Sequence, residues 1–138
     1  MSMNRINLIT LGVADLAKSR AYYEALGWVP EEALENVVFY DMGGAKFGLF
    51  PLHMLAAEQG RSTPDLGTGA MTLAQNYADE TGVDAAFQAA LDAGATAVAQ
   101  PEKMAWGGYS SYVADPDGHI WEFAFNPYWP LDDEGRLA

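Results

Sequence analysis

With 138 residues, half of them hydrophobic, the chain is long enough for one domain with a substantial core. Its net charge of −12 disfavours nucleic acids and anionic membranes as partners, because both are polyanions that bind clustered cations. No apolar run reaches the roughly 18 residues of a membrane span. The lack of cysteine excludes disulfides, thiolate zinc sites and cysteine nucleophiles, and it agrees with a cytoplasmic location.

The first half of the chain reads as a strand, a helix and further strands. LITLGV at 8–13 is β-prone, and the following segment has Asp15 as a helix N-cap and Gly27 as a stop signal. Two β-prone runs, NVVFYDM and AKFGLFPL, come next, while the strand expected near WVPEEA is weakly marked. The segment LHMLAAEQ predicts one or two helical turns.

The second half repeats this pattern. AMTLAQ at 70–75 is β-prone, and the helical spacing that follows ends at Gly94. The helix presents one apolar face, which consists of Val83, Phe87, Ala90 and Leu91. Three strands follow in TAVAQ, YSSYVA and HIWEFAF. The tail 128–138 shows no period, and we expect a surface extension or a partner contact there.

Two local matches support an internal repeat. Thr10-Leu11 corresponds to Thr72-Leu73, and the glycines at 44 and 118 precede the last strand of each half. We predict an α+β fold of two tandem βαβββ modules that form a curved mixed sheet around a cavity, with helices on the outer face. Module 4–60, linker 60–69 and module 69–127 make up one domain, 1–138, because each half alone is too small to bury its sheet.

Strand alternation predicts which side chains face the cavity. One set of strand positions is uniformly apolar and should pack beneath the helices. The other set mixes small and polar residues, as expected for a cavity lining. It consists of Leu8, Thr10, Gly12, Gly48, Phe50, Ala70, Thr72, Ala74, Asn76, Ile120, Glu122 and Ala124.

Glu122 is the most informative member of this set. A carboxylate on a partly enclosed face needs a cation, a hydrogen-bond donor or a proton. It either contacts a ligand or accepts a hydrogen bond from a neighbouring Thr, Tyr or Trp and stabilises the fold. Further candidates for the lining, which could instead fill the core or start a turn, are Trp106, Tyr109, Tyr112 and Asn76.

Two segments resemble one family. LGVADLAKSRAYYEALGW and ADPDGHIWEFAFNP are similar to the vicinal oxygen chelate (VOC) superfamily of glyoxalase I, bleomycin-resistance proteins and extradiol dioxygenases, over roughly residues 5–127. The resemblance implies that the family's metal-ligand positions correspond to Leu8, Ala70, Gly48 and Glu122. Only the last can bind a metal, so no metal and no cofactor is expected.

The resulting expectation is a bleomycin-resistance-like, metal-independent protein that binds a small organic molecule, cationic or aromatic, in the concave sheet. The resemblance also implies a homodimer. The predicted ligand-binding residues are Glu122, Thr10, Thr72, Asn76, Phe50, Trp106, Tyr109 and Tyr112.

Two alternatives stay open. One is a metal-dependent VOC lyase, isomerase or dioxygenase with noncanonical ligands such as His53, His119 or tail carboxylates. His53 is expected in a loop, and His119 has the opposite strand parity to Glu122. The other is a ligand-free interaction protein whose cavity is filled by its own aromatic side chains. No catalytic residue is assigned.

Overall fold

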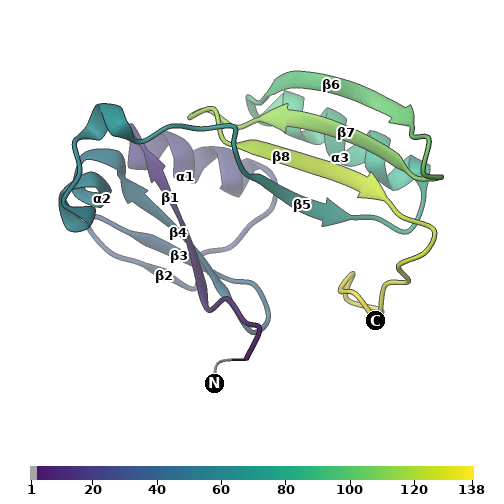
Figure 1. The fold of residues 1–138 in the computed structure, drawn as a ribbon, viewed down its shortest axis with the longest axis horizontal. Helices are drawn as coiled ribbons and strands as arrows, with labels where there is room; N and C mark the ends of the chain where they lie inside the picture. The colour runs from purple at the N-terminus through teal and green to yellow at the C-terminus, as the bar shows by residue number, and fades with distance from the viewer. Residues whose placement is uncertain (1–2) are drawn as a thin grey trace. The chain divides into compact units, whose positions relative to one another are not determined.

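The computed structural model describes residues 3–138, which form two compact units (Figure 1). The first unit ends at Gly67 and the second begins at Thr68, inside the segment predicted as a linker. The α+β class and the two modules are confirmed. Hydrogen bonding divides the strands into two four-stranded mixed sheets, one in each unit.

The first unit contains four strands, two α-helices and a 3₁₀ turn. Its sheet has the order β1-β4-β3-β2, in which β1 and β4 are parallel and the other pairs antiparallel. The strand that was weakly marked in the sequence, near WVPEEA, is β2, which is only two residues long. The elements are β1 (Leu8–Val13), α1 (Leu16–Ala25), β2 (Glu32–Ala33), β3 (Val38–Asp41), β4 (Lys46–Pro51), α2 (Leu52–Gln59) and η1 (Thr63–Asp65).

The second unit repeats this connectivity. Its order is β5-β8-β7-β6, again with one parallel pair, β5 and β8. Helix α3 packs against β6, β7 and β8. The elements are β5 (Thr72–Asn76), α3 (Glu80–Ala93), β6 (Thr96–Lys103), β7 (Tyr109–Ala114) and β8 (Ile120–Phe125).

The helix ends follow the capping residues in the sequence. Asp15 accepts a hydrogen bond from the Lys18 backbone N at 3.1 Å, as an N-cap does. Gly94 ends α3 with a φ of 116°, in the left-handed region that favours glycine. Within residues 3–138, none of the helices combines the length and the apolar character that crossing a bilayer requires.

Most of the apolar set of strand positions is buried, as predicted, but Met71 precedes β5 and is 55% exposed. Leu11 and Leu49 are 2% and 0% exposed in the first unit, and Trp121 and Phe123 are 6% and 4% exposed in the second. The core of the first unit is strongly aromatic. The Tyr23 ring has four aromatic neighbours at centroid distances of 4.9 to 6.3 Å, namely Tyr22, Trp28, Phe47 and Tyr40.

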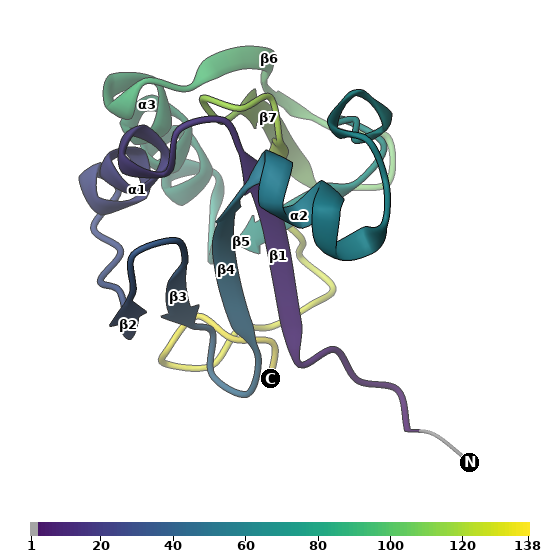
Figure 2. The ribbon, with the colours of Figure 1, turned by 90° about the vertical axis from the view of Figure 1, so that its left-hand side faces the viewer.

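Helix α2 corrects the expectation that all helices lie on the outer face. A Cβ atom added to Gly12 would lie 2.5 Å from Leu52 Cδ1 and 3.2 Å from Leu55 Cδ2. Since Gly12 points away from the buried Leu11 and Val13, these leucines cover the other face of the sheet. Figure 2 shows α2 over one end of β1 and β4. The helix takes this position because it starts directly after β4.

The ladder register also corrects the alignment of the two halves. Lys46 and Ile120 are each the second residue after the glycine of their turn, so they are equivalent. Their partners on the parallel neighbouring strands are Leu8 and Thr72. Thr72 is therefore the counterpart of Leu8, and not of Thr10 as the matching letters predicted. Because the shift is two residues, the assignment of faces is unchanged.

Candidate functional site

Glu122 lies in the middle of β8, with a neighbour on each side. Tyr112 is directly opposite it on β7 and Ala74 is opposite it on β5, so the three side chains share one face. The Glu122 carboxylate is the charged group that acts on the Tyr112 phenol. Partial burial is the main cause that raises the pKa of the Tyr112 phenol, and the charge and hydrogen bond of Glu122 add to it. The two side chains therefore interact across the neighbouring strands.

This pair can still bind a ligand. Glu122 and Tyr112 are both only half-buried. A carboxylate offers about four lone-pair sites, more than one phenol can use. Ile120 lies beside Glu122 on β8, and four other neighbours on the same face have small or short side chains. They are Thr72, Ala74, Ala114 and Ala124.

The surroundings of Glu122 do not fit the metal centre of the family. Ala74 and Tyr112 beside it supply neither an imidazole nor a second carboxylate. In the corrected register, the first-strand ligand position of the second half is Thr72 instead of Ala70, and threonine is no better as a ligand. Among residues 3–138, no three His, Asp or Glu side chains come together to hold an ion.

The two histidines occupy different kinds of position. His53 was expected in a loop, but the structure places it in α2, which starts at Leu52, the residue before it. The His53 side chain is exposed there. His119 belongs to the turn before β8. Its backbone N donates a hydrogen bond to Asp115 Oδ1 at 2.9 Å.

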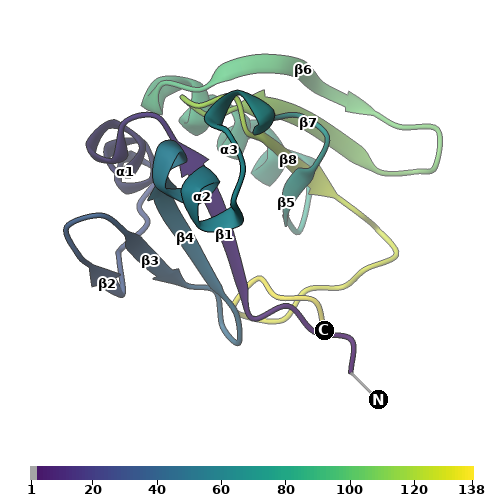
Figure 3. The same ribbon diagram turned by 60° about the vertical axis from the view of Figure 1, so that its left-hand side comes forward.

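Trp106 and Tyr109 do not join the Glu122 pair. Figure 3 shows the turn that joins β6 and β7. Trp106 belongs to this turn and is 46% exposed, with its ring folded onto Gly108. Tyr109 points to the helix side of the sheet, where its hydroxyl donates to Asp84 Oδ1 of α3 at 2.7 Å. The alternation of β7 explains this, since Tyr109 and Tyr112 are three residues apart and face opposite ways.

Tyr109 gives a pH-dependent prediction. The hydrogen bond to Asp84, followed by burial and the charges of Asp84 and Glu80, raises the pKa of Tyr109 from 10.0 to about 12. The Tyr109–Asp84 hydrogen bond therefore stabilises the folded state fully below about pH 10, and this contribution is lost as the pH rises toward about 12. In an absorbance titration of the tyrosine phenols, Asp84→Asn should lower the pKa of one tyrosine back toward 10. Asp92→Asn, on the same helix, is the control; identical curves for the wild type and Asp84→Asn would contradict the assignment.

Thr10 and Phe50 belong to the first unit, and the other six predicted residues to the second. Thr10 pairs with Gly48, and Phe50 pairs with Gly12. A Cβ atom on Gly48 would lie 3.6 Å from Thr10 Oγ1 and 3.2 Å from the Phe39 ring. These residues occupy the face of the first sheet that is equivalent to the Glu122 face of the second.

The C-terminal tail is an ordered turn, although its sequence shows no period. It leaves β8 and folds back (Figure 1). Asp132 Oδ1 accepts hydrogen bonds from the backbone N atoms of Glu134 and Arg136, both at 2.9 Å. Leu131 forms a β-bridge with Leu137. Backbone pairing and one capping carboxylate therefore hold the tail in shape.

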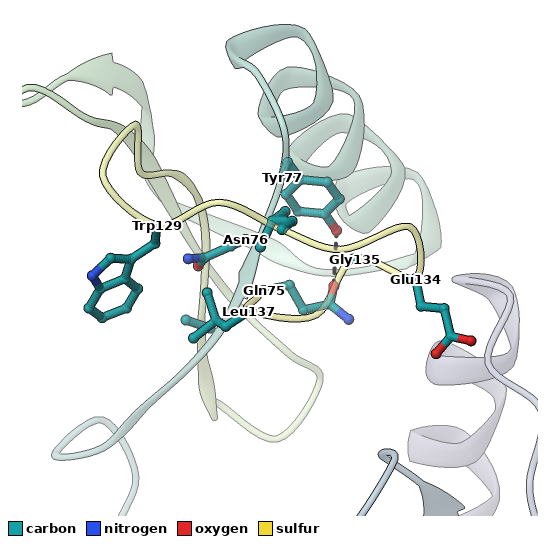
Figure 4. A pocket seen from close by; sticks show the side chains of 9 residues that line it. Gln75, Asn76, Tyr77, Trp129, Glu134, Gly135 and Leu137 are labelled. Atoms are coloured by element: carbon teal, nitrogen blue, oxygen red, sulfur yellow. Dashed lines mark hydrogen bonds between the residues drawn. The ribbon is translucent and has the colours of Figure 1, made fainter.

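A groove lies between the end of β5 and this tail (Figure 4). It consists of two adjoining hollows of about 480 and 520 Å³, within the usual range of small-molecule sites. Both are lined by Asn76, Tyr77, Trp129, Leu131 and Gly135. Of these residues, only Asn76 was predicted. The missed signal was a tryptophan in the non-periodic segment NPYWPL, where no core required it.

Polar and aromatic contacts hold Tyr77 beside the groove. Its hydroxyl donates to Gln75 Oε1 at 3.0 Å, as Figure 4 shows. Its ring packs against Phe123 with a centroid distance of 6.2 Å, and burial raises the pKa of its phenol. The backbone N of Tyr77 donates to the Ala124 carbonyl at 2.8 Å. This side of the groove is therefore anchored to β8.

Comparison with known proteins gives consistent results. A model of the Glyoxalase/Bleomycin resistance protein/Dioxygenase superfamily matches residues 5–123. A glyoxalase-related enzyme from Fulvimarina pelagi is 34% identical with a TM-score of 0.90, covering 99% of this chain and 98% of that one. Lactoylglutathione lyase from Agrobacterium tumefaciens shares the fold, at 20% identity and a TM-score of 0.69 over 95% of this chain and 100% of the lyase.

Curated sequence relatives add a local match. An uncharacterized protein from Mycobacterium tuberculosis and one from Mycobacterium bovis are 56% identical to this chain over 41 residues. The match covers 30% of the chain and about a quarter of each mycobacterial protein, 24% and 27% respectively. It is therefore a similarity of one segment only.

Proposed function

We propose, since the chain belongs to the Glyoxalase/Bleomycin resistance protein/Dioxygenase superfamily, that it binds a small organic molecule on the Glu122 face of the second sheet without a metal ion. The observation that carries the proposal is the half-buried Tyr112–Glu122 pair, flanked by small side chains. It offers a carboxylate to a donor or cationic group of the ligand.

Charge supports a cationic ligand. The net charge of −12 raises the local concentration of cations around the protein. A carboxylate accepts a strong, charge-assisted hydrogen bond from an ammonium or guanidinium group. The proposal includes a homodimer in the cytoplasm, which the family resemblance and the lack of cysteine support.

The test begins with a thermal-shift screen of small cationic, aromatic and thioether compounds, because a ligand selective for the folded state raises the melting temperature. For a compound that binds, Glu122→Gln should weaken the affinity about tenfold or more, as expected for a lost charge-assisted hydrogen bond. Tyr112→Phe should have a smaller effect. Glu35→Gln, in the exposed turn between β2 and β3, is the charge-matched control. Equal affinities for the wild type and Glu122→Gln would contradict the proposal.

A second candidate is a metal-dependent lyase, isomerase or dioxygenase with noncanonical ligands. It is favoured by the Fulvimarina pelagi relative, which is described as a glyoxalase-related enzyme. Metal analysis of protein purified without a chelator separates the two candidates. Stoichiometric metal that is lost in Glu122→Ala would support the enzyme and overturn the metal-independent proposal.

A further inference from the structure

We infer that the groove between β5 and the C-terminal tail binds an aromatic ring and the positively charged group attached to it, with Trp129 as the stacking surface and Asn76 as the hydrogen-bonding group. The inference deepens the proposed function and rests on it for the existence of a ligand. It adds that the C-terminal tail determines which class of ligand binds.

The duplicated fold is the first observation. In the corrected register, Gly12 and Phe50 of the first sheet are equivalent to Asn76 and Ala124 of the second. Helix α2 follows β4 in the first unit, and the tail follows β8 in the second. The two segments thus occupy equivalent positions after equivalent strands.

The two segments differ in how they pack. In the first unit, two α2 leucines lie so close to Gly12 that a Cβ atom there would meet them. In the second unit, the tail leaves a hollow of about 480 Å³ beside Asn76. The Asn76 side chain, an amide with both hydrogen-bond donors and an acceptor, lines this hollow. The duplicated position is therefore closed in one unit and open in the other.

The chemistry of the lining favours a cation. Three acidic residues are among those that line the two hollows: Asp133, Glu134, and Asp132, whose Oδ1 also accepts the hydrogen bonds of the tail turn. Arg136 pairs with Glu134, but among the described residues that line the hollows there is no Lys, Arg or His. The Trp129 side chain is large and the residue is 56% exposed. A cation over an indole face is attracted by the negative potential of the ring.

The groove continues from the proposed site. Ala74 lines the groove and is also directly opposite Glu122 on the neighbouring strand. Asn76 is two residues further along β5 and so lies on the same face. A ligand whose polar end contacts Glu122 can therefore extend past Ala74 toward Trp129.

The experiment uses three probes that share one ring system: 2-naphthylmethylamine, which is a cation at neutral pH, the neutral 2-naphthalenemethanol, and the anion 2-naphthoate. Affinities are measured by calorimetry and by NMR shifts of the indole N–H groups. The amine should bind most tightly, the alcohol about five- to tenfold more weakly, and the naphthoate weakest of all. Equal binding of the amine and the naphthoate would overturn the inference.

Variants assign the site. Trp129→Ala should weaken amine binding about tenfold, and Trp129→Phe should retain most of it. Tyr128→Ala is the matched control, because Tyr128 is the adjacent aromatic residue, 70% exposed, and does not line the groove. Melting temperatures show that each variant is folded. Unchanged affinity in Trp129→Ala, or equal loss in Tyr128→Ala, would overturn the inference.

The outcomes also separate this inference from the proposed function. A compound whose binding is weakened by Glu122→Gln and not by Trp129→Ala supports the proposed function and overturns the groove. A compound weakened by Trp129→Ala and not by Glu122→Gln supports the groove and contradicts the role of Glu122. Failure of the naphthyl amine to bind the wild-type protein at all overturns the groove alone.

Discussion

Replacing Tyr23 with Ala should lower the free energy of unfolding by about 3–5 kcal/mol, the usual cost of truncating a buried aromatic residue. Tyr23 is 0% exposed, and its ring is surrounded by four other aromatic rings in the first unit. The substitution removes these contacts and leaves a cavity between α1 and the sheet, which the rigid neighbours cannot fill. Urea unfolding followed by circular dichroism measures the loss.

The control for Tyr23 is an exposed tyrosine. Tyr128→Ala, at a position that is 70% exposed, should change the free energy of unfolding by no more than about 0.5 kcal/mol. If Tyr23→Ala had an equally small effect, the aromatic cluster would not be the core of this unit.

Replacing Asp115 with Ala should lower the free energy of unfolding by about 1–2 kcal/mol, because it removes the shared acceptor of two half-buried backbone donors. Asp115 is 4% exposed, and its Oδ1 accepts hydrogen bonds from the backbone N atoms of Asp117 and His119, both at 2.9 Å. These bonds shape the turn that leads into β8. Urea unfolding measures the effect.

The matched control for this turn is Asp115→Asn, which keeps an oxygen in place to accept both hydrogen bonds. We expect it to retain more stability than Asp115→Ala. Because the turn sets the start of β8, Asp115→Ala should also disturb the Tyr112–Glu122 pair. Equal stabilities of the two variants would show that the acceptor oxygen is not what the turn requires.

Most of the fold could be predicted because its signals are local. An aspartate before an apolar-periodic segment predicted the start of α1, and Gly94 predicted the end of α3. Alternation within short strands predicted that Trp121 and Phe123 are buried. The tail could not be predicted in this way, since the interactions that shape it, Asp132 with two backbone donors and one bridge between leucines, leave no period.

The candidate site was only partly predictable. The carboxylate on β8 was evident from its residue type, and its neighbour on β7 follows once the hairpin register is known. The alternation in YSSYVA already indicates that Tyr109 and Tyr112 face opposite ways, which the prediction of a common lining did not take into account. Trp129 needed the folded tail, because the groove forms only when this segment lies beside β5.

The two-residue difference between matching letters and matching hydrogen bonds affects how the internal repeat is aligned in this chain. Leu8 and Thr72 share no chemistry, yet they hold the same place in their ladders. Comparing the halves by backbone geometry recovers this equivalence, whereas a search for identical letters pairs Thr10 with Thr72. An offset of two residues hides such an error, because the faces of the sheet assigned to the side chains still agree. Protein engineers who transfer a side chain from one half to the other should therefore align the halves by strand register.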